Sequence, residues 1–114
     1  MKVFIRVMKA LSDPNRVKIM KMLQISPLCV CEIKEALGIA QSTASKHLKI
    51  LEDAELLRSF KDGLWVNYSL SDGSGSPYSA SMIGNLKHWL DDESEIKELN
   101  QILPSIDRHD IVGK

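Results

Sequence analysis

Residues 41–51 read QSTASKHLKIL, a narrow apolar stripe set in polar residues. Ala44, Leu48 and Leu51 recur at the spacing of one helix face, which predicts an amphipathic helix from Gln41 to Asp53. Serine, threonine and glutamine reach base edges or phosphates in a DNA major groove, and lysine adds charge attraction. The candidate DNA-contacting residues of this helix are Gln41, Ser42, Thr43, Ser45, Lys46, His47 and Lys49.

A second helix is expected directly before this one. Ser26 and Pro27 suit its first turn, and Gly38 closes it as a left-handed cap. Only residues 38–40 separate the two helices, which is typical of a helix-turn-helix, here over about residues 30–53. Polar outer faces are common on ordinary surface helices, so the helix alone does not decide the function. The order of the neighbouring elements favours DNA binding.

A β-hairpin is expected after the helix-turn-helix. Two short stretches of alternating pattern flank a turn at Asp62-Gly63, which predicts a hairpin, or wing, over about residues 56–70. The order helix, helix, helix-turn-helix, hairpin, helix predicts a mainly α winged helix-turn-helix fold with a β-hairpin wing. The candidate DNA contacts of the wing are Arg58 and Lys61.

The two ends of the folded chain are predicted to be helical. Apolar residues at helical spacing indicate one helix over about residues 2–11 and another over about residues 78–90. Ser12 or Asp13 can cap a further helix that follows the first. The pattern leaves open whether residues 78–103 form one helix or two. A domain of this size buries only about two thirds of its unfolded surface, so dimerisation is favoured.

Composition indicates one folded domain. The chain has 114 residues, of which 44% are hydrophobic and 26% charged, and we expect a domain over residues 1–103 and a loose tail over 104–114. Fifteen basic and fifteen acidic residues balance, but residues 1–24 carry six cations against one acid, and residues 91–98 carry five acids against one cation. No membrane span or signal peptide is recognisable, so we expect a cytoplasmic protein.

Three segments resemble the ArsR/SmtB family of metal-sensing repressors: ALSDPNR at 10–16, LCVCEI at 28–33, and the segment 41–51. The second segment is the most specific and is similar to the inducer site of the arsenical-responsive branch. The resemblance implies a homodimer that binds a palindromic DNA operator. It also implies release of the DNA when trivalent arsenic or antimony binds the thiolates of Cys29 and Cys31, with no organic cofactor.

The resemblance covers about residues 3–90 and implies that the first and last helices join the two subunits. A two-fold dimer would place its recognition helices about 34 Å apart, one turn of DNA. Some of the apolar residues on these helices must belong to the core of each subunit. The candidate interface residues are Phe4, Val7, Met8, Leu11, Met82, Leu86 and Trp89.

The spacing of Cys29 and Cys31 constrains how they bind a ligand. On a regular helix their side chains would diverge by about 200°, with Cys29 inward and Cys31 near Glu35 on the polar side. Metal–sulfur bonds are only about 2.3 Å long, so one soft ion could hold both sulfurs only at a frayed helix start or after unwinding of the first turn. A helix N-terminus lowers a thiol pKa and favours the thiolate. We expect binding to deform the support of the recognition helix and weaken DNA binding.

The chain departs from the family pattern at the metal sites. Lys34 stands where many members have a third thiol, and there is no third cysteine, so water, a free thiol or an oxygen ligand would complete a two-thiolate site. The C-terminal zinc motif of the family is not matched, because Leu86 and Leu99 occupy two of its positions. A solvated helix face is our interpretation of His88, Asp92 and Glu95.

Other functions stay open at this point. The same fold could respond to thiol oxidation, sulfur species or another soft metal, although a Cys-x-Cys disulfide closes a strained ring. A thiol oxidoreductase would leave the helix-turn-helix unexplained, and no other catalytic motif is recognisable, so an enzyme is not expected. A winged-helix DNA-binding protein without metal sensing, or an adaptor that binds only protein, is the remaining alternative. A salt-dependent gel shift would separate an adaptor from a repressor.

Overall fold

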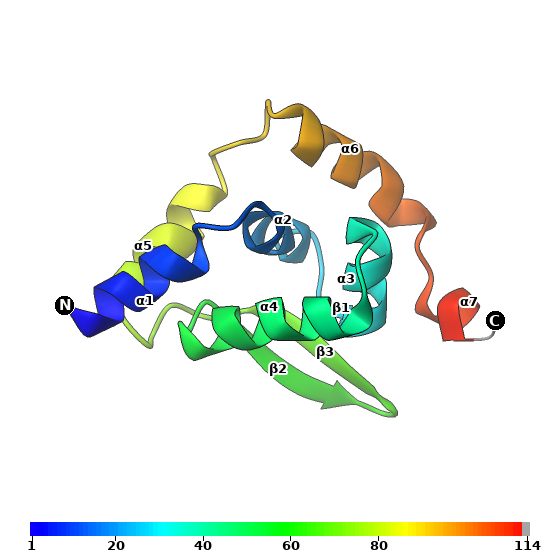
Figure 1. Ribbon diagram of the computed structural model, residues 1–114, viewed down its shortest axis with the longest axis horizontal. Coiled ribbons are helices and arrows are strands. Elements are labelled where there is room, and N and C mark those ends of the chain that lie inside the picture. Colours follow the sequence, from blue (N-terminus) through cyan, green and yellow to red (C-terminus); the bar gives the residue numbers. More distant parts are fainter. Residues whose placement is uncertain (113–114) are drawn as a thin grey trace.

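The computed structural model describes residues 1–112, which form a group of helices and a small three-stranded sheet whose hairpin projects from one side (Figure 1). None of the helices in this range is long and apolar enough to cross a membrane. The elements are α1 (Lys2–Ala10), α2 (Pro14–Leu23), β1 (Leu28–Cys29), α3 (Val30–Leu37), α4 (Gln41–Asp53), β2 (Leu57–Asp62), β3 (Trp65–Leu70), α5 (Pro77–Leu86), α6 (Ser94–Ile102), a 3₁₀ turn η1 (Leu103–Ser105) and α7 (Arg108–Val112).

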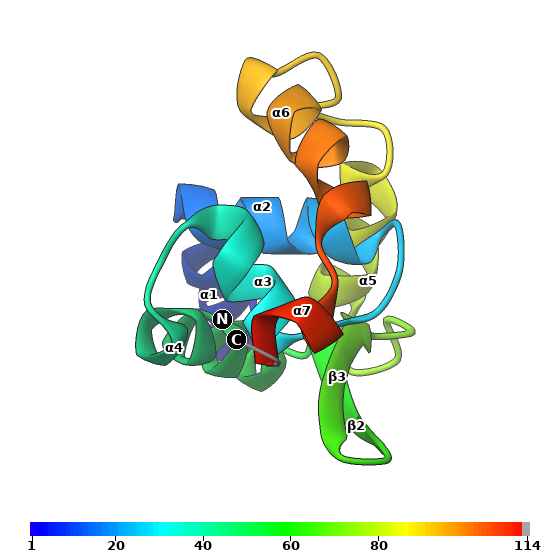
Figure 2. The ribbon, with the colours of Figure 1, turned by 90° about the vertical axis from the view of Figure 1, so that its right-hand side faces the viewer.

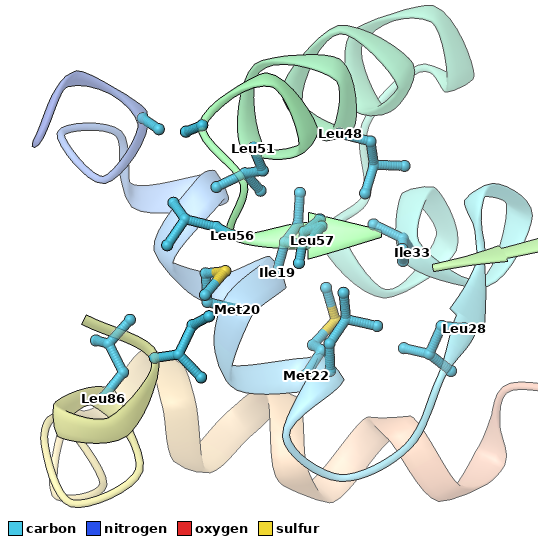
Figure 3. Close-up of a cluster of buried hydrophobic side chains, with 14 of the residues drawn as sticks. Ile19, Met20, Met22, Leu28, Ile33, Leu48, Leu51, Leu56, Leu57 and Leu86 are labelled. Carbon is cyan, nitrogen blue, oxygen red and sulfur yellow. The ribbon is translucent and has the colours of Figure 1, made fainter. Parts of the chain in front are cut away.

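Helix α2 lies at the centre of the molecule (Figure 1), and the hydrophobic core forms around it (Figure 3). Its N-cap is Asp13, whose carboxylate accepts hydrogen bonds from the backbone N–H groups of Asn15 at 2.8 Å and Arg16 at 3.2 Å. This confirms the predicted cap. Side chains from α2, α3, α4 and the segment after α4 fill the centre. The largest fully buried ones include Ile19, Met20, Met22, Ile33, Leu48, Leu51 and Leu56.

The helix before the recognition helix begins later than predicted. The predicted start at Ser26 and Pro27 is wrong, because α3 begins at Val30 with Cys29 as its N-cap. Leu28 and Cys29 form β1 instead, which pairs antiparallel with β3 in a sheet of order β1-β3-β2. Gly38 closes α3 with φ +66°, which confirms the left-handed cap. The predicted bounds of α4 agree with the structure.

The wing is a two-stranded hairpin, as predicted. Asp62 pairs with Trp65, so the loop consists of Gly63 and Leu64 and lies one residue later than predicted. Gly63 has φ +63°, a left-handed backbone conformation that two-residue hairpin loops require and that glycine adopts without strain. The mainly α winged helix-turn-helix fold is thereby confirmed.

The segment after the wing contains two helices. The predicted helix over 78–90 is too long, because α5 ends at Leu86 and Leu90 takes a left-handed conformation with φ +70°. The ammonium of Lys21, which is buried, donates at 2.8 Å to the carbonyls of Leu86 and Trp89 and pairs with Asp91 at the same distance. Because the Lys21 ammonium donates to carbonyls at the end of α5, it stabilises the turn that separates α5 from α6.

The segment expected to be a loose tail contains most of η1 and the short helix α7. After η1, helix α7 packs against α3 near the wing (Figure 2). Arg108 donates from Nη1 to Oδ1 of Asn67 at 3.0 Å, and its guanidinium lies 5.0 Å from the centre of the Trp65 ring. These contacts with side chains of β3 give the C-terminal segment a fixed place, which local sequence pattern does not reveal.

Candidate functional site

The recognition helix α4 presents the polar face that its sequence predicts. Ala44, Leu48 and Leu51 are fully buried against the core. Most of the candidate DNA contacts on the helix are exposed, and they lie at its N-terminal end and along the face away from the core. The exposed ones are Gln41, Ser42, Thr43, Ser45, Lys46 and Lys49.

His47 differs from these residues because it is half-buried and engaged inside the protein. Its Nδ1 lies 3.2 Å from Nη1 of Arg16. The same guanidinium donates from Nε to the carbonyl of Ala10 at 2.7 Å and from Nη2 to the carbonyl of Lys9 at 3.2 Å. His47 therefore helps to fix α4 against the junction of α1 and α2. The sequence pattern did not single out Arg16 for this role.

The cations of the candidate interface differ in their partners. Lys49 pairs with Asp53 at 3.1 Å, and Arg58 on the wing pairs with Asp72 at 3.2 Å. Lys46 and Lys61 are exposed and have no ion-pair partner among the side chains that the structure describes. Exposed ion pairs contribute at most about 1 kcal/mol, so all four cations can turn toward a phosphate at little cost.

Both thiols are buried. Cys29 is 2% exposed and Cys31 is 8% exposed. The prediction that Cys31 lies near Glu35 on the polar side of the helix is wrong. It assumed that both cysteines belong to one helix, whereas Cys29 belongs to β1 and has an extended backbone. The divergence of about 200° does not apply to a pair that straddles the end of a strand and the start of a helix.

The pKa of Cys29 moves in the direction opposite to the prediction. Burial and a hydrogen bond with Cys31 raise the pKa of the Cys29 thiol to about 12. The Glu32 carboxylate, which accepts a hydrogen bond from the Cys29 N–H at 2.9 Å, adds negative charge that raises it further, and the Glu32 N–H lowers it only in part. Cys29 is therefore a protonated thiol near neutral pH. Sequence reasoning missed Glu32, although its place three residues after the N-cap is the capping-box spacing.

The donor set fits a soft ligand that needs two sulfurs. The two thiols are neighbours at the start of α3, and the side chains that the structure describes contain no cluster of three or more His, Cys, Asp or Glu able to hold a metal ion. His88, Asp92 and Glu95 are exposed and form no such cluster. A structural zinc site needs four protein ligands, so the pair fits a metalloid or a soft ion that accepts external ligands.

The candidate dimer residues divide into two groups. Val7 and Leu86 are buried in the core, and Met8, Leu11 and Met82 are half-buried against it. Phe4 is 40% exposed and Trp89 is 48% exposed. Tyr78, which sequence reasoning missed, meets the Phe4 ring edge to face at 5.3 Å between centroids. The exposed apolar residues of α1, α5 and the turn after α5 are Met1, Val3, Phe4, Ile5, Tyr78, Trp89 and Leu90.

Comparison with known proteins agrees with this architecture. The family described as bacterial regulatory protein, arsR family, matches residues 13–59. The arsenical resistance operon repressor of Bacillus subtilis is 43% identical over 65 residues, which cover 56% of this chain and 62% of that protein. A cadmium resistance transcriptional regulatory protein CadC homolog of Staphylococcus aureus is 41% identical over 68 residues, which cover 59% of this chain and 56% of that protein.

These matches span only about three fifths of the two relatives, but a solved structure extends the likeness. HlyU from Vibrio cholerae is 30% identical, with a TM-score of 0.62, and the match covers 75% of this chain and 88% of that one. The family match includes Cys29, Cys31 and the whole of α4, the segments on which the candidate site is built. The chain belongs to the arsR family of bacterial regulatory proteins.

Proposed function

We propose that this chain is a DNA-binding transcriptional repressor that releases its operator when trivalent arsenic or antimony binds Cys29 and Cys31. The observation that carries the proposal is the position of the two thiols. Both are buried, and they lie one residue apart where β1, which pairs with the wing strand β3, passes into the helix that supports α4. Two relatives, an arsenical resistance repressor and a cadmium resistance regulator, support a soft inducer of this kind.

DNA binding rests on α4 and the wing. The exposed hydroxyls near the N-terminus of α4 are suited to base edges and phosphates in the major groove, and Lys46 extends the same face with an unpaired charge. Arg58 and Lys61 lie on the hairpin beside it, where they suit phosphates or the adjacent minor groove. This arrangement supports a winged helix-turn-helix that reads one half-site per subunit.

A homodimer supplies the second half-site. The proposed contact surface consists of exposed apolar side chains of α1, α5 and the turn after α5, namely Phe4 and Tyr78, whose rings are in contact, with Trp89 and Leu90. A two-fold axis through this surface would relate two copies of α4 and produce a palindromic operator. We therefore propose that α1, α5 and the turn after α5 form the dimer contact. Phe4 is exposed on α1, and Trp89 is exposed in the turn.

The switch is proposed to act on both parts of the DNA-binding surface. Cys29 is paired with Asn67 of β3, so it belongs to the sheet that carries the wing. Cys31 lies in the first turn of α3, which packs against α4. A ligand bonded to both sulfurs fixes the distance between them and thereby the placement of the wing relative to the helix-turn-helix. A coupling of about 1–3 kcal/mol would weaken DNA binding by about 5–150-fold.

The chemistry of arsenic suits protonated thiols. Arsenous acid, As(OH)₃, reacts with two thiols to form two As–S bonds and release two water molecules, with no change in oxidation state. The thiol protons leave in the water, so a high thiol pKa is no obstacle to this condensation. A divalent soft ion such as Cd²⁺ must instead displace the proton of Cys29 to solvent. The raised pKa of Cys29 thus favours the metalloid over the dication near neutral pH.

The test is a binding assay with a fragment of the promoter region, titrated in turn with arsenite, antimonite, Cd²⁺, Zn²⁺ and peroxide. We expect arsenite and antimonite to release the DNA from the wild type and not from the double variant Cys29→Ser, Cys31→Ser. Both proteins should bind the DNA equally without inducer. Release of the double variant by arsenite would overturn the sensing site, and release by peroxide alone would favour thiol oxidation as the signal.

A further inference from the structure

The basic N-terminal segment has a place in the fold that the proposed function does not use. Lys2, Arg6 and Lys9 are spaced i, i+4 and i+7 on α1, so they lie on one face of the helix. All three are exposed. None of them, and not Arg16 either, has an ion-pair partner in the part of the chain that the structure describes.

This face forms one wall of an open groove beside the recognition helix. The groove has a volume of about 630 Å³. Figures 1 and 2 show α1 next to α4, and the two helices are in contact. Its charged lining residues are Lys2, Arg6, Lys9, Arg16 and Asp53, and its apolar ones are Met1, Ile5, Ala10 and Ile50.

The position of α1 relative to α4 is fixed. The Arg16 guanidinium joins the carbonyls of Lys9 and Ala10, at the end of α1, to His47 of α4. The one carboxylate lining the groove, that of Asp53, is paired with Lys49 at 3.1 Å. The groove therefore carries an excess of positive charge on a rigid wall.

The groove opens on the side of α4 that is proposed to face DNA. Ile50 lies one helical turn after Lys46, so the exposed cation and the groove are neighbours on the helix surface. Phe4 lies on a different face of α1, in contact with Tyr78 of α5. A dimer contact through Phe4 would therefore leave Lys2, Arg6 and Lys9 free.

We propose that Lys2, Arg6 and Lys9 bind the phosphate backbone of the same DNA whose bases α4 reads. From Lys2 to Lys9 the helix rises about 10 Å, at about 1.5 Å per residue. Phosphates of one DNA strand advance about 3.4 Å along the axis, so this row of cations matches several successive phosphates better than it matches a single small anion. The inference rests on the proposed DNA binding and adds a second contact surface to it.

The charge distribution explains why such a surface is needed. The chain is electrically neutral overall, with fifteen basic and fifteen acidic residues, so it has no general attraction for a polyanion. Of the six cations in residues 1–24, Lys18 and Lys21 pair with Glu95 and Asp91. The other four, Lys2, Arg6, Lys9 and Arg16, all line the groove, so the positive charge that is not neutralised is gathered there. Binding would then depend on local contacts with phosphates.

The experiment compares DNA binding by the wild type, Arg6→Gln, and the triple variant Lys2→Gln, Arg6→Gln, Lys9→Gln at several salt concentrations. Lys97→Gln is the matched control, because Lys97 is an exposed cation of α6 for which the described side chains supply no ion-pair partner. Removal of one cation from a phosphate should reduce the slope of log K against log salt by about 0.9, and each substitution removes one cation from each subunit of the dimer.

We expect the wild type and Lys97→Gln to share one slope, and the triple variant to bind both operator and unrelated DNA more weakly with a shallower slope. Thermal melting and sedimentation should show that every variant is folded and has the oligomeric state of the wild type. An unchanged slope in the triple variant would overturn the α1 contact and leave the proposed repressor intact. Absence of DNA binding by the wild type would instead overturn the proposed function, and this inference with it.

Discussion

Cys29 and Asn67 lie directly opposite each other in the antiparallel pair formed by β1 and β3. Asn67 is buried, and its side-chain carbonyl accepts the hydrogen bond from Arg108 at 3.0 Å. The thiol pair is thus connected on one side to the wing and, through the wing, to α7. A change in the position of Cys29 is expected to reach β3 before it reaches α4.

Substitution of Arg108 by Met should loosen this connection. The side-chain oxygen of Asn67 would lose its partner in a buried position, and the free energy of unfolding should fall by about 1–3 kcal/mol. Urea denaturation measures the loss, and hydrogen exchange should show faster opening of the β1–β3 pair. Lys97→Met, which removes an exposed cation from α6, should change neither quantity. Equal stability of the two variants would show that α7 does not hold the wing.

The recognition helix and the wing could be predicted from the sequence because local pattern determines them. The apolar stripe of α4 has one periodicity from Ala44 to Leu51, and Gly38 marks the end of the helix before it. Gly63 supplies the left-handed residue of the hairpin loop. Each of these signals is contained within a few residues, and the structure agrees with the prediction to within one residue at each place.

The environment of the thiols could not be predicted in the same way. Strand β1 has only two residues, and it exists because β3, some forty residues later, offers a free edge. Once Leu28 and Cys29 pair with this edge, α3 must start at Val30, and Cys31 turns toward the core. Burial then raises the pKa of Cys29 in place of the lowering that a helix N-terminus predicts. The contact of Arg108 with Asn67 is equally non-local.

The raised pKa of Cys29 predicts different pH dependences for the two kinds of inducer. Between pH 6 and 8 the thiol is protonated, so each Cd²⁺ that binds it must release its proton, and the affinity for Cd²⁺ should rise about tenfold per pH unit or more. Condensation with arsenous acid releases water, so its affinity should change little over this range. Competition titrations at several pH values measure both, with Cys29→Ser as the control. A flat affinity for Cd²⁺ would contradict a protonated Cys29.

The same pKa has a consequence for stability at alkaline pH. The unfolded thiol ionises near its ordinary pKa of 9.0, whereas the folded one stays protonated to about pH 12. Between these values the unfolded state binds fewer protons than the folded state, so the free energy of unfolding should fall as pH rises. Cys29→Ala should show a weaker fall over this interval in urea denaturation. Parallel curves for the two proteins would be inconsistent with the raised pKa.

Lys21 should contribute far more to stability than its ion-pair partner. Its buried ammonium donates to the carbonyls of Leu86 and Trp89, so Lys21→Met would leave the Trp89 carbonyl without this donor and the Leu86 carbonyl with only the long bond from the Trp89 N–H at 3.4 Å, at a cost of about 1–3 kcal/mol. Asp91 is 62% exposed, and Asp91→Asn should cost less than about 1 kcal/mol. Thermal or urea unfolding of the two variants measures the difference. Similar losses of stability in both variants would show that Lys21 stabilises the fold through its ion pair with Asp91 and not through its hydrogen bonds to the carbonyls at the end of α5.

The exposed apolar surface of α1 should control the oligomeric state. Phe4 is 40% exposed and lies against Tyr78, so Phe4→Glu would place a charge in the proposed dimer contact while leaving the core of the subunit intact. We expect sedimentation equilibrium to show a shift from dimer to monomer. The DNA affinity should also fall, because a monomer contacts only one half-site of the operator. Leu64→Glu is the matched control, since Leu64 is a fully exposed apolar residue in the wing loop and its substitution should leave the dimer unchanged. A Phe4→Glu protein that sediments as a dimer would place the subunit contact on another surface, and a wild type that sediments as a monomer at micromolar concentration would contradict the homodimer itself.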